Sequence, residues 1–151
     1  MPPVAPQVPI AISFLSLNCH VPVSSGIQDQ VYLKYNGKRI FPTQGQKYHR
    51  LAKGERVKFE DVSLTFARRD EVDTVVIELW YRKNLVQNAL AGRFFLMLNI
   101  SEVGISATQL IRNSEQDQSH YLLHWELSSL ESKPIVEERV NVETDQGNFT
   151  L

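Results

Sequence analysis

The one cysteine of this 151-residue chain is followed directly by a histidine, as Cys19-His20. A thiol and an imidazole are the nucleophile and base of one class of covalent catalyst, provided that the two side chains meet. Here they are neighbours in an apolar run that reads as a β-strand, where successive side chains point to opposite faces. The sequence therefore favours a buried core cysteine over a catalytic pair.

Two further pairs have residue types suited to chemistry. His120 and His124 have the spacing that places two metal ligands on one helix face, but their segment alternates as a strand, where four residues span about 13 Å. Asp70 and Asp73 are carboxylates of the acid–base type, yet they lie in a polar connection between two expected strands. The sequence contains no phosphate-binding loop, dinucleotide glycine fingerprint, nucleophile elbow or paired-cysteine metal site. We therefore predict no enzyme, no metal site and no cofactor.

The elements that must carry these residues are strands. Apolar and polar residues alternate in residues 31–35, 62–66, 75–81, 94–100 and 121–127. Such alternation is typical of strands with one buried and one wetter face. Asn36-Gly37 is a strong hairpin signal, because both positions of that turn need positive φ. The pattern predicts an all-β fold, an antiparallel eight-stranded β-sandwich.

Both ends of the chain differ in composition from the middle. Residues 1–9 hold four of the seven prolines and predict an extended N-terminal arm. The β-sandwich is expected over residues 10–128, and residues 129–151 form an acidic C-terminal tail, either disordered or an extra strand that pairs elsewhere. The apolar run ending at Cys19 lacks a basic leader, so we expect a buried first strand and not a targeting signal. With a single cysteine, the default location is the reducing cytoplasm.

Charge is asymmetric within the chain although the formal net charge is only -1. Eight of the 16 Lys and Arg residues fall in a short basic segment: Lys34, Lys38, Arg39, Lys47, Arg50, Lys53, Arg56 and Lys58. On strands these side chains could share a face and attract phospholipid headgroups, nucleic acid or an acidic protein. The alternative is a solvated edge, where lysine protects against aggregation.

The order of these features resembles that of a C2 domain. The run "IAISFLSLNCHVPVSSGIQDQVYLKY" is similar to the first strand, first loop and "DPYVKV" strand of that family. "VKFEDVSLTFA" resembles its fourth strand, "DTVVIELWYRKNLVQNALAGRFFLMLNISEVG" its following hairpin, and "HYLLHWEL" its closing strand. The resemblance covers about Ile10 to Leu127 and implies a C2-like sandwich.

The resemblance also implies what the loops do. Calcium-binding members carry several aspartates in two loops, because a hard cation needs converging oxygen ligands. Here Asp29 matches one of them, and Arg82 and Lys83 occupy the second loop, which predicts degenerate, calcium-independent loops.

Members of the family without calcium commonly serve as protein-interaction or scaffold modules. We therefore expect a non-catalytic interaction or assembly module with a protein partner or self-assembly, and no nucleic acid or small-molecule substrate. The alternative is a peripheral membrane module that binds acidic phospholipids through the basic strands, since "QKYHRLAKGERVK" lies where the family's lysine-rich cluster falls.

Overall fold

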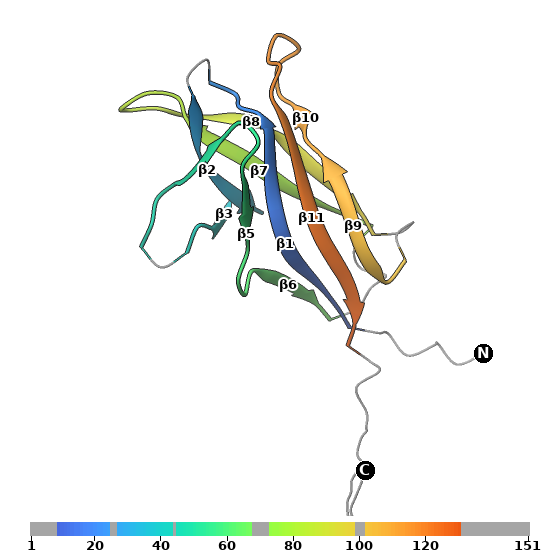
Figure 1. The fold of residues 1–151 in the computed structure, drawn as a ribbon. Coiled ribbons are helices and arrows are strands. Elements are labelled where there is room, and N and C mark those ends of the chain that lie inside the picture. Colours follow the sequence, from blue (N-terminus) through green and yellow to red (C-terminus); the bar gives the residue numbers. More distant parts are fainter. Residues whose placement is uncertain (1–8, 25–26, 44, 68–72, 99–101, 131–151) are drawn as a thin grey trace, which may run out of the picture.

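The computed structural model describes residues 9–24, 27–43, 45–67, 73–98 and 102–130. These residues form two antiparallel β-sheets packed face to face (Figure 1). Over the same ranges we find no helix whose length and apolar character would suit a membrane span. Residues 1–8 of the expected arm and 131–151 of the expected tail lie outside the described residues.

The first sheet has five strands, and it contains the first and the last strand of the described chain. Its order is β5 (Arg56–Lys58), β1 (Ile10–Val21), β11 (His120–Ser129) and β9 (Gly104–Gln109), and β6 (Ser63–Phe66) pairs with another stretch of β1. The central pair, β1 and β11, is antiparallel over its whole length, from Ile10 opposite Ser129 to Val21 opposite His120.

The second sheet has six strands. Its order is β10 (Ile111–Arg112), β8 (Asn88–Met97), β7 (Thr74–Arg82), β2 (Gln28–Tyr35) and β3 (Lys38–Phe41), and β4 (His49–Ala52) pairs with the first half of β2. Asn36 and Gly37 have φ of 53° and 80° in the turn between β2 and β3. The hairpin that Asn-Gly predicts is therefore confirmed.

The predicted antiparallel sandwich is confirmed, and its eight strand positions are divided into more pieces than expected. β3 and β4 occupy successive stretches beside β2, and β5 and β6 do the same beside β1. After β9 the chain changes sheets, so that β10 pairs with β8. This crossing requires Gly92, since a Cβ there would lie 2.2 Å from the carbonyl oxygen of Ile111.

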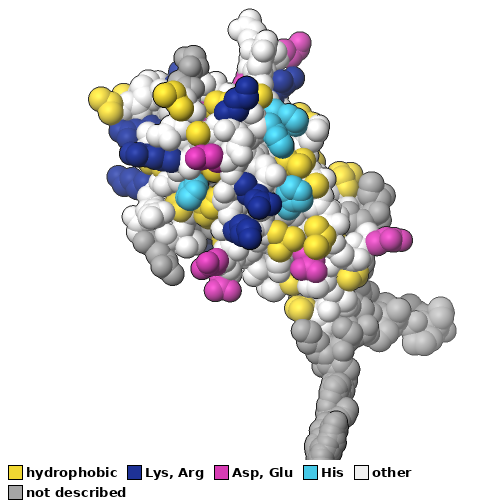
Figure 2. Space-filling view, viewed as in Figure 1, with side chains coloured by type: hydrophobic (Ala, Val, Ile, Leu, Met, Phe, Trp, Pro, Cys, Tyr) yellow, Lys and Arg dark blue, Asp and Glu magenta, His cyan; other side chains and the backbone are white. Residues whose placement is uncertain are grey.

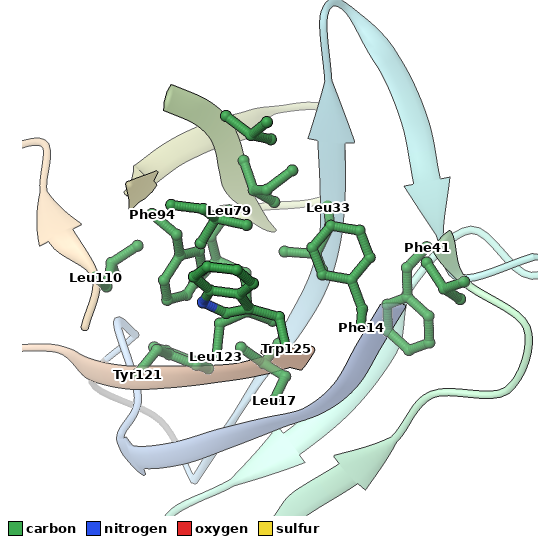
Figure 3. Close-up of a cluster of buried hydrophobic side chains, with 14 of the residues drawn as sticks. Phe14, Leu17, Leu33, Phe41, Leu79, Phe94, Leu110, Tyr121, Leu123 and Trp125 are labelled. Atoms are coloured by element: carbon green, nitrogen blue, oxygen red, sulfur yellow. The ribbon is translucent and has the colours of Figure 1, made fainter. Parts of the chain in front are cut away.

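The core lies between the sheets and follows the alternation of the sequence. Figure 3 shows Leu79 and Phe94 of the six-stranded sheet facing Trp125 and Leu123 of β11. All four are buried, and the indole Nε1 of Trp125 donates to Thr108 Oγ1 at 2.9 Å. A buried indole N–H that finds a partner carries no desolvation penalty, so this large ring can fill the centre of the sandwich.

Candidate functional site

The structure places five of the eight basic residues on two opposite faces and the other three in loops or at a strand start. Lys34 and Arg39 are paired across β2 and β3 on the outer face of the six-stranded sheet, and Arg50 lies opposite Gln30 on that same face. Arg56 and Lys58 belong to β5 of the other sheet and flank Val57, which packs against the core. Three more are exposed in loops or at a strand start: Lys38, Lys47 and Lys53. The basic segment therefore does not form one surface.

Aromatic rings lie against three cations of the six-stranded sheet. The guanidinium carbon of Arg39 lies 3.7 Å from the ring centre of Tyr32, and that of Arg82 lies 5.6 Å from Tyr48. Lys34 Nζ is 4.8 Å from the ring centre of Trp80. These are cation–π distances. We call this group the basic–aromatic cluster: Tyr32, Lys34, Arg39, Tyr48, Trp80 and Arg82.

The three rings of the basic–aromatic cluster were missed at the sequence level. Tyr32 alternates with the buried Val31 and Leu33, and Trp80 follows the buried Leu79, so both rings stand on the outer face. Their planes lie 16° apart with centres separated by 6.2 Å. Burial under its neighbours raises the pKa of Tyr32, which keeps the phenol neutral. The available signal was large aromatic residues at the polar positions of alternating strands.

The acidic side chain nearest this face is already engaged. Glu78 accepts a hydrogen bond from Trp80 Nε1 at 3.0 Å and pairs with Arg93 at 3.4 Å. Within the described residues, no carboxylate forms an ion pair with Lys34, Arg39 or Arg82. Arg39 and Arg82 instead donate hydrogen bonds to the backbone carbonyls of Lys47 and Asn84.

The β7–β8 loop, residues 83–87, projects beside this face and is internally hydrogen-bonded. Lys83 N donates to the Gln87 carbonyl at 2.9 Å, and Val86 N donates to Asn84 Oδ1 at 3.0 Å. The loop holds out two aliphatic side chains, Leu85 and Val86, which are 85% and 92% exposed. The sequence directed attention to Arg82 and Lys83, but not to the Leu-Val pair that follows them.

Asp29, assigned from the sequence to a degenerate loop, is the second residue of β2 and only 2% exposed. Its carboxylate accepts hydrogen bonds from Val23 N at 2.6 Å, from Ser24 N at 2.8 Å, and from the hydroxyls of Ser24 and Tyr121. Burial and the neighbouring Asp29 charge raise the pKa of Tyr121 far above its usual value, which keeps the hydroxyl a donor. Asp29 therefore ties the β1–β2 loop to β11.

Calcium is expected to leave the melting temperature unchanged. The Asp29 oxygens already accept protein donors, and Arg82 at the end of β7 and Lys83 at the start of the following loop stand where a cation site needs oxygens. In the described part of the chain no three metal-ligating side chains gather. Thermal unfolding in millimolar calcium, compared with the same measurement in a chelator, gives the change in melting temperature. A rise of several degrees would contradict the prediction, since a ligand of the native state raises its stability.

Three of the four histidines, His20, His120 and His124, lie on the outer face of the five-stranded sheet, whereas His49 belongs to β4 and packs against Phe41. Figure 2 looks onto this face and shows histidine and basic side chains over β1, β5 and β11. His120 packs against His20 with ring centres 4.8 Å apart, whereas His124 Nδ1 lies 3.3 Å from Ser16 Oγ. His120 and His124 are thus not brought together. Cys19 is buried on the other side of β1 from His20, and burial raises the pKa of its thiol.

Comparisons with known proteins address the fold. No protein-family model and no curated protein sequence matches the chain. Among solved structures the chain is similar to a C2 domain, with 14% identity over 81% of this chain and 99% of that one, at a TM-score of 0.44. It is also similar to a C2 domain of plant extended synaptotagmin 1, with 10% identity over 83% of this chain and 98% of that one, at a TM-score of 0.48. The likeness is one of fold alone, and the C2-like sandwich expected from the sequence agrees with it.

Proposed function

We propose that this protein is a non-catalytic module that docks on membrane surfaces containing acidic phospholipids. The contact surface consists of the basic–aromatic cluster and the β7–β8 loop. The observation that carries the proposal is the pair Leu85 and Val86, held almost fully exposed one residue after the cations Arg82 and Lys83. Exposed aliphatic side chains next to cations that form no ion pair among the described residues are suited to an anionic bilayer interface.

The two parts form one surface because Arg82 belongs to both. Its guanidinium lies against Tyr48 of the cluster, and its Nε donates to the Asn84 carbonyl in the loop at 3.3 Å. A second link is the hydrogen bond of 3.0 Å from the Tyr48 hydroxyl to Asn88, the first residue of β8. The cations of the cluster and the Leu85 and Val86 side chains of the loop can therefore contact the same membrane surface.

The two kinds of contact differ in their response to salt. Each Lys or Arg close to an anionic leaflet contributes about 1 kcal/mol, and this attraction is screened as ionic strength rises. Burial of the Leu85 and Val86 side chains in the acyl boundary depends on apolar area and is not screened. Binding should therefore weaken at high salt without disappearing.

Co-sedimentation with vesicles of phosphatidylcholine containing about 20% phosphatidylserine tests the proposal. We expect Lys34→Gln combined with Arg39→Gln to weaken binding about thirtyfold at low salt, since two cations are lost. The matched control is Arg56→Gln combined with Lys58→Gln, which removes two cations from the opposite face. Equal losses in both variants, or equal binding to vesicles without phosphatidylserine, would overturn the proposed surface.

A second pair of changes separates the apolar contribution. Leu85→Ser combined with Val86→Ser should remove the binding that persists at about 500 mM salt, where charge attraction is screened within a few ångströms. Both side chains are solvated in the free protein, so the melting temperature should stay within a few degrees. Unchanged binding at high salt would exclude the loop from the contact.

The interaction or assembly role that the sequence favoured rests on other parts of the molecule. Partner capture by the two ends concerns residues 1–8 and 131–151, outside the described residues, and stays a prediction. Within the sandwich, self-assembly is supported by β9, an edge strand of the five-stranded sheet that contains no charged residue.

A further inference from the structure

β9 is an edge strand whose only neighbour among the described residues is β11. The outer side of such a strand carries backbone N–H and C=O groups that can pair with another chain. Protein edges are usually protected by charge, proline or short length. The six residues of β9, GISATQ, contain neither a charge nor a proline. Its edge is therefore open to strand pairing.

The other edge strands described here are protected. β3, β4, β5 and β10 each contain at least one Lys or Arg, and β6 is neutral but only four residues long. A cationic edge repels a second copy of itself, whereas a neutral edge does not. The neutral, six-residue β9 is thus the edge of this sandwich best suited to meet its own copy.

Exposed apolar side chains accompany this edge. Val103 and Ile105 are 60% and 68% exposed, and they lie just before and within β9. Residues of odd number share the outer face of the strand, because Ser106 and Thr108 point inward with the core indole of Trp125. Burial of these aliphatic groups would add apolar area to the backbone pairing.

We propose that β9 pairs antiparallel with β9 of a second copy of this chain, with Ala107 opposite Ala107. The two five-stranded sheets then form one continuous sheet across a two-fold axis. In this register Ile105 lies beside Gln109 of the second copy, and this contact occurs twice. An in-register parallel arrangement would instead bring the two Glu102 side chains, just before β9, together.

This inference is independent of the proposed membrane docking. The β7–β8 loop and the basic–aromatic cluster belong to the six-stranded sheet, whereas β9 is the end strand of the five-stranded sheet. Figure 1 shows β9 at the opposite side of the sandwich from β2 and the β7–β8 loop. A dimer formed through β9 keeps the membrane surface of each copy uncovered.

Cysteine crosslinking of the full chain tests the pairing and its register. Residues directly opposite in an antiparallel pair have Cα atoms about 4.5–5.5 Å apart, within disulfide range. Ala107→Cys should therefore give a covalent dimer under mild oxidation. Ile105→Cys should not, because the two copies of residue 105 lie about 13 Å apart. The native Cys19 is buried and does not compete.

Light scattering measures the association itself. The unmodified chain should give twice the 17.3 kDa of one copy at high concentration. Ile105→Lys, at an exposed position, should weaken association about tenfold or more by placing cations near the two-fold axis. Ile27→Lys is the matched control, because Ile27 is 85% exposed in another loop. A monomer at all concentrations, or equal crosslinking at positions 105 and 107, would overturn the inference.

Discussion

Replacement of Asp29 by alanine is expected to lower the free energy of unfolding by about 3–5 kcal/mol. The buried carboxylate accepts from the backbone N–H groups of Val23 and Ser24 and from the hydroxyls of Ser24 and Tyr121. Without it, these donors lose their acceptor, and a buried donor left unpaired costs about 1–3 kcal/mol. Urea unfolding measures the change.

Two controls make this result specific. Asp73→Ala removes a carboxylate of the same type from an exposed position and should change stability by less than about 0.5 kcal/mol. Tyr121→Phe removes only one of the donors and should cost about 1–2 kcal/mol. If Asp29→Ala were as stable as Asp73→Ala, Asp29 would not be the anchor of the β1–β2 loop.

Replacement of Leu79 by alanine is expected to cost about 2–5 kcal/mol of stability. Leu79 is fully buried and lies between Leu33 of β2 and Gly92 of β8 in the six-stranded sheet. Gly92 has no side chain that could move into the space, so most of the cavity would persist. Figure 3 shows Leu79 beside Phe94 and Trp125, which would lose packing contacts.

The matched control for Leu79 is Leu85→Ala. It makes the same change on an 85% exposed side chain just beyond β7 and should alter stability by less than about 0.5 kcal/mol. An unchanged urea m-value in both variants would show that the two-state transition is preserved. Equal stability of Leu79→Ala and the parent would mean that the strand face is assigned wrongly.

Much of the fold follows from local pattern. Alternation with period two decides which side chains of a strand share a face, and this geometry is a property of the backbone. Val31 and Leu33 are buried as their spacing predicts, and so are Leu79, Leu123 and Trp125. The Asn36-Gly37 turn was predictable for the same reason, because positive φ is a local requirement of the residue.

The number of strands and the points where they break were less predictable. Eight strands were expected, whereas the chain changes sheets between β9 and β10 and interrupts two of the other positions. Whether a strand continues depends on which neighbour offers a backbone partner, and that neighbour is distant in sequence. The close approach of Gly92 to Ile111 is one such contact.

The candidate surface depended on tertiary structure in the same way. Eight basic residues in one short segment suggested a single face, yet Arg56 and Lys58 belong to the sheet opposite Lys34 and Arg39. A strand's sheet is chosen by long-range pairing, which residue type and spacing do not encode. The stacking of Arg82 on Tyr48 likewise joins two segments that are separate in the sequence.

By itself, the amino-acid sequence determined the buried faces of the long alternating strands, the hairpin at Asn36-Gly37 and the core position of Cys19. These depend on the local geometry of the backbone, which alternates side chains between the two faces of a strand, and on the tendency of the apolar face to leave water. Only the tertiary structure decided the role of Asp29, whose hydroxyl donor on Tyr121 lies 92 residues away. The sequence matched its carboxylate to one position of a degenerate, calcium-independent loop. It is a structural anchor because the folded chain surrounds it with hydrogen-bond donors.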